Sequence, residues 1–186
     1  MIGAVRHRAK YQDLVELPEN VIGEIVDGEL RVQPRPASPH LVVAMSLGEE
    51  LGPPFRRGRG GPGGWVLLAE PELRFGEDVL VPDYAGWRRA RMRVIPEVPY
   101  FELTPDWACE ILSPSTLAYD RVTKLRVFAR ESIPFVWLID PLAKTLEALR
   151  LEGGAYVIAA LHEGQEKARV PPFDAIELDL SVLWER

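Results

Sequence analysis

The sequence predicts an α/β protein of the mixed α+β type, in which a central mixed sheet is flanked by helices and accompanied by β-hairpins. Two observations favour this fold. Runs rich in Val, Leu, Ile, Trp and Tyr recur between turn residues from residue 65 onward, and two longer segments, residues 40–51 and 117–132, predict helices. A length of 186 residues suits one core, so we expect a single domain over residues 1–186.

The first fifty residues predict two helices with a hairpin between them. Residues 11–17 (YQDLVEL) predict a short helix that a proline ends. In VIGEIVDGELRV, Asp27 and Gly28 predict the turn between two short strands, because these residues tolerate positive φ. Ser38 is expected to cap the long helix HLVVAMSLGEEL, with Pro39 at the first helical position.

The middle of the chain predicts a loop followed by the central strands. Residues 52–64 (GPPFRRGRGGPGG) are dense in glycine and proline, which is typical of a mobile surface loop, here one that could border a substrate cleft. The segments WVLLAEPELRF, VLVPDYAGW and DWACEIL, at residues 65–75, 79–87 and 106–112, predict three strands of the central sheet.

The last third predicts a second long helix, a strand and a hairpin. Ala118, Val122, Leu125 and Ala129 recur at helical spacing within residues 117–132. PFVWLID predicts a further strand, TLEALRLEGGAYVIAALHEG a hairpin that turns at its glycine pair, and LSVLWER a short closing piece. The helix has three candidate capping residues, which are Ser113, Ser115 and Thr116.

Charge and composition restrict the partners. The formal net charge of -6 opposes nonspecific attraction to nucleic acid, so any DNA contact must be local. No apolar run reaches the roughly 20 residues that cross a bilayer, and the opening residues lack a signal-peptide core, so we expect a cytoplasmic protein without a membrane partner. Two basic clusters are candidate DNA contacts, although each also suits a solvated loop: Arg56, Arg57 and Arg59, and Arg88, Arg89, Arg91 and Arg93.

Two carboxylates lie where strands predict burial or irregularity. Glu110 shares a strand face with Ala108 and Leu112, so it is expected to be buried and to need a cation, a metal or dense hydrogen bonding. Asp83 follows Pro82, which indicates a strand end, an edge or a bulge. The alternatives are a structural ion pair for Glu110 and an ordinary turn for Asp83. Together, two such carboxylates suit a divalent cation held against a phosphate.

Three further residues complete the candidate site. Lys124 follows Glu110 by 14 residues, on the helix after that strand, and could lean over the strand end; its alternative is an exposed pair with Asp120. Glu24 lies between apolar same-face neighbours and could supply a third metal-binding carboxylate. His40, near the start of the first long helix, is a candidate supporting residue or an ordinary surface histidine.

The order of these residues resembles the Uma-type (Uma two) family of restriction-endonuclease-like proteins, within the PD-(D/E)XK nuclease superfamily. The resemblance covers nearly the whole chain. One departure concerns the superfamily's Glu-x-Lys, which is Glu110-Ile111-Leu112 here, so that the lysine moves to the next helix. The matching positions are Glu24 with Asp27-Gly28, His40, Pro82-Asp83, EILSPS from Glu110, Asp120 with Lys124, and WLIDP from Trp137.

The resemblance implies a restriction-endonuclease-like fold, a Mg2+ or Mn2+ requirement and hydrolysis of DNA phosphodiester bonds. Asp83, Glu110 and Glu24 would bind the metal, and Lys124 would orient a water or stabilise charge on the phosphate. A homodimer or higher homo-oligomer is expected, because double-strand cleavage requires two sites. The main alternative is a catalytically inactive DNA-binding or assembly module; a glycosidase pair of carboxylates has no need of the lysine.

Overall fold

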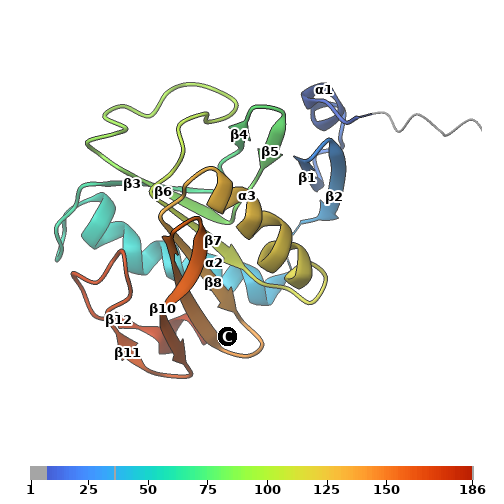
Figure 1. Ribbon diagram of the computed structural model, residues 1–186. Coiled ribbons are helices and arrows are strands. Elements are labelled where there is room, and N and C mark those ends of the chain that lie inside the picture. The colour runs from blue at the N-terminus through green and yellow to red at the C-terminus, as the bar shows by residue number, and fades with distance from the viewer. Residues whose placement is uncertain (1–7, 36, 186) are drawn as a thin grey trace, which may run out of the picture.

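The computed structural model describes residues 8–35 and 37–185 (Figure 1). A six-stranded mixed sheet with the order β10-β9-β8-β7-β6-β3 forms its centre. The pair β7–β8 is parallel and the other neighbours are antiparallel, which confirms the mixed α+β class. The strands are β3 (Trp65–Ala69), β6 (Tyr84–Arg88), β7 (Trp107–Ile111), β8 (Phe135–Asp140), β9 (Thr145–Glu152) and β10 (Ala155–Glu163).

A second sheet of four strands, ordered β2-β1-β5-β4, lies beside the first. Its hairpin β1–β2 turns at Asp27 and Gly28, both at positive φ, as the sequence predicts. A third, two-stranded sheet pairs β11 with β12. The strands are β1 (Val21–Val26), β2 (Glu29–Pro34), β4 (Leu73–Phe75), β5 (Asp78–Leu80), β11 (Lys167–Ala168) and β12 (Leu178–Asp179).

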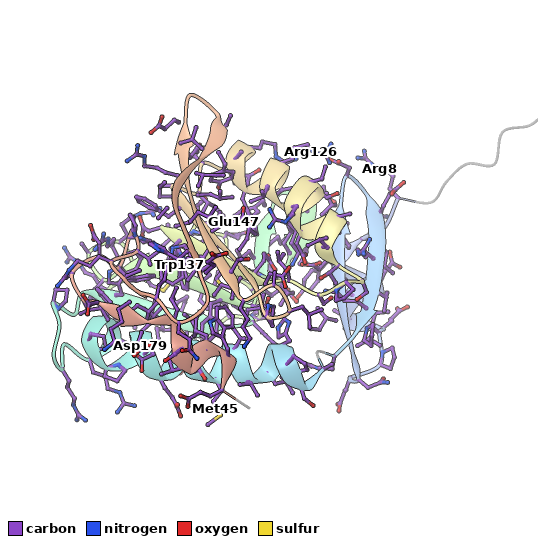
Figure 2. The ribbon with its side chains drawn as sticks, turned by 90° about the horizontal axis from the view of Figure 1, so that it is seen from below. Arg8, Met45, Arg126, Trp137, Glu147 and Asp179 are labelled. Atoms are coloured by element: carbon purple, nitrogen blue, oxygen red, sulfur yellow. The ribbon has the colours of Figure 1, made fainter. Side chains whose placement is uncertain are left out.

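Two helices cover opposite faces of the six-stranded sheet (Figures 1 and 2). Helix α2 (Ser38–Leu51) packs its buried residues against the face that carries Trp107 and Trp137. Helix α3 (Leu125–Arg130) packs Val127 and Phe128 against the other face. Successive residues of β7 alternate between these two cores, as the period of a strand requires. In the described residues, no helix is long and apolar enough to cross a membrane.

The long segments 65–75 and 79–87 do not each form one central strand. Each divides between the two sheets, giving β3 and β4 from the first and β5 and β6 from the second. The first segment breaks where Glu70 adopts φ 46°, and the second breaks at Pro82, which has no N–H to continue a ladder. The prediction of a strand end at Pro82 is therefore confirmed, and the placement of both whole segments in the central sheet is wrong.

Local differences concern helix ends and the glycine-rich segment. Ala37, not Ser38, is the N-cap of α2, because Pro39 fits the second helical position as well as the first. Residues 52–64 do not begin as a loop: Gly52–Arg56 form a π-helical turn that buries Phe55 against Phe173, with ring centroids 4.7 Å apart.

The other helices keep their predicted places with shorter or altered forms. Helix α1 is Tyr11–Val15, and the closing piece is a 3-10 helix, Leu180–Trp184. The second long helix is π-helical over Tyr119–Lys124 before it continues as α3. The candidate cap hydroxyls bond one another, with Ser113 Oγ at 3.0 Å from Ser115 Oγ and 2.9 Å from Thr116 Oγ1.

Candidate active site

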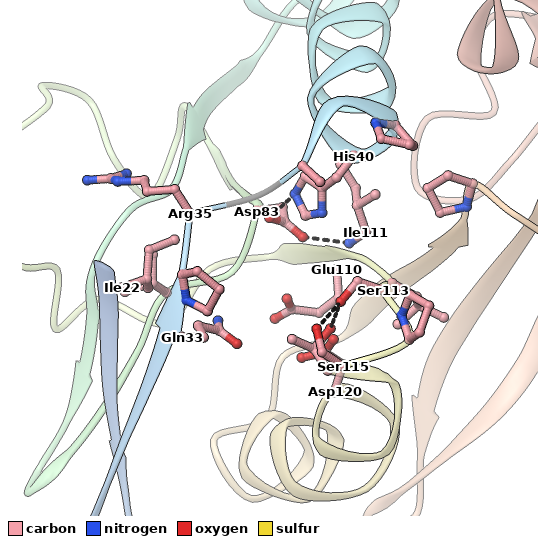
Figure 3. A pocket seen from close by; sticks show the side chains of 18 of the residues that line it. Ile22, Gln33, Arg35, His40, Asp83, Glu110, Ile111, Ser113, Ser115 and Asp120 are labelled. Atoms are coloured by element: carbon pink, nitrogen blue, oxygen red, sulfur yellow. Dashed lines mark hydrogen bonds and ion pairs between the residues drawn. The ribbon is translucent and has the colours of Figure 1, made fainter. Parts of the chain in front are cut away.

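A pocket of about 380 Å³ opens where β7 ends and α2 begins (Figure 3). We call it the strand-end pocket. It also lies beside the break between β5 and β6 and beside the start of the helix that leads to α3. Ordered by sequence, its charged and histidine lining residues are Arg35, His40, Glu70, Asp83, Glu110, Asp120 and Lys124.

Lys124 lies at the bottom of this site within a group of carboxylates. Its Nζ is 3.0 Å from Glu24 Oε1 and 3.0 Å from Glu110 Oε2, and 3.8 Å from Asp120 Oδ1. It also donates to the carbonyl of Val81 at 3.2 Å. The contacts with Glu110 and Val81 are hydrogen bonds, and those with Glu24 and Asp120 are ion pairs.

The group is almost fully buried, which makes its charges costly. The side chains of Lys124 and Glu24 are 2% and 1% exposed, and that of Glu110 is 3% exposed. This confirms the expectation that Glu110 and Glu24 are buried on their strands. With Asp120, three carboxylates surround one ammonium, so the ionised group carries excess negative charge in a low-dielectric setting.

The pKa values reflect this burial. Burial raises the pKa of Glu110 well above its ordinary value, although the Lys124 ammonium opposes the shift. Burial also raises the pKa of Asp120, again against the effect of Lys124. Burial alone would lower the pKa of Lys124, but the charges of Glu110, Glu24 and Asp120 outweigh it and hold that pKa well above its ordinary value. Lys124 is therefore a cation at neutral pH.

Two oxygens of this group lack partners among the described residues. Glu24 Oε1 accepts from the Val81 N–H at 2.8 Å, but Glu24 Oε2 and Glu110 Oε1 are buried without a hydrogen bond. A buried carboxylate oxygen left without a donor costs free energy. The oxygens are thus suited to a further cation.

Asp83 lies at the side of the pocket nearest α2. Its Oδ1 is 2.7 Å from His40 Nε2, and its Oδ2 accepts from the backbone N–H of Ile111 at 2.6 Å. Pro82, directly before Asp83, interrupts the strand pairing. Ile111, whose N–H binds Asp83, is the last residue of β7. These contacts fix the carboxylate beside Glu110 (Figure 3).

Lys124 and Asp120 lie in a π-helical segment at the start of the second long helix. Tyr119–Lys124 uses wider turns than an α-helix, and both Asp120 and Lys124 in it are buried. Such segments recur at functional sites, because the extra residue per turn re-aims side chains. The alternative, an exposed pair of Asp120 with Lys124, is wrong because both side chains are buried.

The structure brings Glu24, Asp83, Glu110, Asp120 and Lys124 together with His40, but it does not place the arginine clusters there. None of Arg56, Arg57, Arg59, Arg88 and Arg89 lines the strand-end pocket. The N–H of Arg89 donates to Gly64 O, and Arg88 pairs with Trp65, so Arg88 and Arg89 lie at the end of the β3–β6 pair that is farther from Asp83. Their role in binding DNA stays a prediction.

Sequence reasoning missed two charged lining residues, Arg35 and Glu70. They lie 35 residues apart and join through an ion pair of 3.0 Å between Nη1 and Oε2. Glu70 adopts a positive φ in the turn between β3 and β4, which no residue pattern in the sequence indicates. Nothing in the sequence pattern pairs it with Arg35.

As the side chains stand in residues 8–35 and 37–185, no group of three His, Cys, Asp or Glu is arranged to hold a metal. The donor set nevertheless fits an oxygen-preferring divalent cation, since the two unpartnered oxygens belong to Glu24 and Glu110 and Asp83 lies beside them.

A mixed sheet covered on both faces, with acids and a lysine in one pocket at its strand ends, defines the restriction-endonuclease-like class. The chain belongs to the Uma2 family: the family model, described as "Putative restriction endonuclease", matches residues 9–182.

Solved structures agree on the fold. Five chains of solved structures match this one, among them the crystal structure of a "putative nuclease belonging to DUF820" from Anabaena variabilis. That structure has a TM-score of 0.71 and 20% identity, and the match covers 95% of this chain and 97% of the other. At this identity the likeness shows the fold alone. No curated protein matches.

Proposed function

We propose that this protein is a Mg2+-dependent endonuclease that hydrolyses DNA phosphodiester bonds in the strand-end pocket. The observation that supports this best is the arrangement of Asp83, Glu110 and Lys124 around one pocket in a chain of a nuclease family. The two unpartnered carboxylate oxygens add a reason for a divalent cation, Mg2+ or Mn2+.

Asp83 and Glu110 would hold the metal, with Glu24 as a third carboxylate. When bound, the metal supplies Lewis-acid activation of the scissile phosphate and of an attacking water. The protein's own groups prepare the site. His40 and the Ile111 N–H orient Asp83, while Glu24 fixes both Lys124 and the backbone of Val81.

Lys124 keeps its proton, so it acts as a cation and donor and not as a base. It donates hydrogen bonds to Glu110 and to the Val81 carbonyl and forms an ion pair with Glu24, which makes it a positioning group for Glu110 and Glu24 in this arrangement. Stabilisation of phosphate charge requires that a phosphate oxygen replace one of these contacts.

The test is cleavage of plasmid and oligonucleotide DNA by the purified protein with Mg2+, with Mn2+ and with EDTA. The variants Asp83→Asn, Glu110→Gln and Lys124→Met keep side-chain size, and each should lower the rate by at least 100-fold. An exposed substitution outside the pocket and outside both arginine clusters, Arg150→Ala, is the matched control for the preparation. Metal-dependent cleavage that survives in all three variants would end the proposal.

The alternative is an inactive nuclease-like module that binds DNA or assembles with other chains. It is favoured by one observation, the ammonium of Lys124 standing between Glu24 and Glu110 where a metal would compete. Titration with Mn2+ separates the two functions: the nuclease should bind the ion with an affinity that falls in Asp83→Asn, and the module should not bind it.

DNA and a second copy of the chain are the proposed partners. Cleavage of both strands of a duplex requires two sites, which a twofold dimer provides. Light scattering should give twice the monomer mass at working concentration. A monomer that still makes double-strand breaks in a single encounter would contradict the dimer.

A further inference from the structure

Arg35 and Glu70 form an ion pair at the edge of the strand-end pocket. Arg35 follows β2, and Glu70 lies in the turn after β3, so two different sheets bring them together. Their side chains are 55% and 39% exposed, and both residues line the pocket. The pair is thus open to solvent and to a ligand.

The charges that line this pocket leave one cation available to a substrate. Lys124 is 2% exposed and is bound to carboxylates. Among the described lining residues, Arg35 is the other basic side chain, apart from His40, which contacts Asp83. A polyanion that enters between carboxylates needs a positive group at the entrance, and Arg35 occupies that position.

The bonds that hold Arg35 are weak ones. Its ion pair with Glu70 is exposed and screened by water, and its second contact, from Nη2 to the carbonyl of Glu19, is long at 3.4 Å. A guanidinium binds a phosphate through two parallel N–H bonds, which are stronger than an exposed pair. A phosphate can therefore replace Glu70 as the partner of Arg35.

Glu70 itself is held in place by its backbone. Its N–H donates to the carbonyl of Asp83 at 3.0 Å, which ties it to the segment that carries the candidate metal ligand. It adopts φ 46°, in the left-handed region that glycine and asparagine occupy with less strain than glutamate. A glutamate in this position places a carboxylate beside the exposed guanidinium of Arg35. In Figure 3 the Arg35 side chain extends from the pocket edge, away from Asp83 and Glu110.

We propose that Arg35 is a phosphate-binding residue at the entrance of the strand-end pocket, and that Glu70 competes with substrate phosphate for its guanidinium. The phosphate belongs to the backbone of a nucleic acid that enters the pocket. This inference rests on the proposed function, because it takes the substrate to be a nucleic acid. Glu70 then lowers the affinity of the pocket for weakly binding polyanions. A nucleic-acid strand that binds in the pocket displaces Glu70 from the guanidinium of Arg35.

The test is binding of a fluorescent single-stranded oligonucleotide in EDTA at low ionic strength, measured by anisotropy for four proteins and one control. Arg35→Ala should weaken binding about 5- to 10-fold and lower the slope of log K against log salt by about 0.7. Glu70→Gln should tighten binding about 2- to 5-fold, the effect of releasing one exposed ion pair. Arg150→Ala removes another exposed arginine of an ion pair, outside the pocket and outside both arginine clusters, and should change binding by less than about 2-fold.

The double variant Arg35→Ala/Glu70→Gln decides whether Glu70 acts through Arg35. If the two residues compete as proposed, the double variant binds like Arg35→Ala, and the gain from Glu70→Gln disappears. An equal gain in both backgrounds means general repulsion by Glu70 and overturns the proposal. So does an unchanged affinity in Arg35→Ala, or the absence of measurable binding by the unaltered protein.

Cleavage assays separate this inference from the function on which it rests. With Mg2+, Arg35→Ala should raise KM and leave kcat within about 2-fold, as expected for a group that binds ground and transition states alike. If the unaltered protein cleaves DNA and the Arg35→Ala variant binds and cleaves as well as it does, the phosphate-binding role of Arg35 is refuted and the nuclease proposal stands. If the protein does not cleave DNA but its oligonucleotide binding depends on Arg35, the nuclease proposal is refuted and the phosphate-binding site stands.

Discussion

His40 Nε2 lies 2.7 Å from Asp83 Oδ1, which joins the first turn of α2 to the break between β5 and β6. Both side chains are mostly buried, with exposures of 14% and 15%. The second oxygen of Asp83 accepts from the Ile111 N–H, so three elements fix one carboxylate. A ligand held in this way has its lone pairs directed before a metal arrives.

His40→Ala should therefore reduce Mn2+ affinity and Mg2+-dependent cleavage by about 10- to 100-fold, as loss of a partner of a metal ligand commonly does. The free energy of unfolding should change by less than about 1 kcal/mol, since a water can replace the imidazole in the pocket. Calorimetric titration with Mn2+ and urea unfolding measure the two quantities. His162→Ala, which removes a histidine–carboxylate pair outside the pocket, is the control and should leave both unchanged. Equal metal affinity in His40→Ala would refute the positioning role.

Lys124→Met should destabilise the protein by about 3–5 kcal/mol in EDTA, because it leaves Glu24, Glu110 and Asp120 buried without their shared cation. Mn2+ should recover more stability in this variant than in the unaltered protein, since the ion can take the place of the ammonium. Urea unfolding with and without Mn2+ measures both effects. A loss below about 1 kcal/mol would mean that the carboxylates are not ionised together.

Part of this site was predictable because its signals are local. Glu110 is the one charged residue in the apolar strand β7. The period of two along a strand places it with Ala108 on the face toward α3. Pro82 marks the end of a ladder for a reason that holds in any context. The resemblance to a nuclease family then orders these residues, and the family match over residues 9–182 agrees with it.

The rest depends on contacts between distant segments. The division of residues 65–75 and 79–87 between two sheets follows from tertiary pairing, since both halves of each have strand character. The π-helical turns of Tyr119–Lys124 have no distinct residue pattern, yet they bury Asp120. The pair of Arg35 with Glu70 joins residues that no periodicity relates.

Phe55→Ala should destabilise the protein by about 3–5 kcal/mol, although it lies in a segment whose composition predicts a mobile loop. Phe55 is 1% exposed and packs on Phe173, which also contacts Trp65. Removing the ring leaves a cavity in the core under α2. Thermal unfolding measures the loss. The control Arg57→Ala, two residues further and exposed, should change stability by less than about 0.5 kcal/mol; an equally small effect of Phe55→Ala would show that the segment does not support the core.

Glu110→Gln should stabilise the protein in EDTA while it abolishes metal-dependent cleavage. Burial raises the pKa of Glu110 well above its ordinary value, so the folded state binds this proton more tightly than the unfolded state does. Such a group contributes stability that is present below its unfolded pKa and is lost as the pH rises through its folded pKa. Glutamine has the same shape without the charge and does not incur this loss, and Lys124 still has Glu24 and Asp120 as partners.

The gain from Glu110→Gln should therefore grow with pH, from near zero at about pH 5 to about 1–3 kcal/mol at about pH 8. Urea unfolding across this range in EDTA gives the curve. Glu49→Gln removes an exposed carboxylate on α2 and should show no such slope. Saturating Mn2+ should reverse the order of stability, because the unaltered protein binds the ion and the variant has lost a ligand. A variant that is less stable than the unaltered protein at every pH in EDTA would mean that Lys124 fully compensates the buried charge of Glu110, and that the site has no excess negative charge for a metal to neutralise.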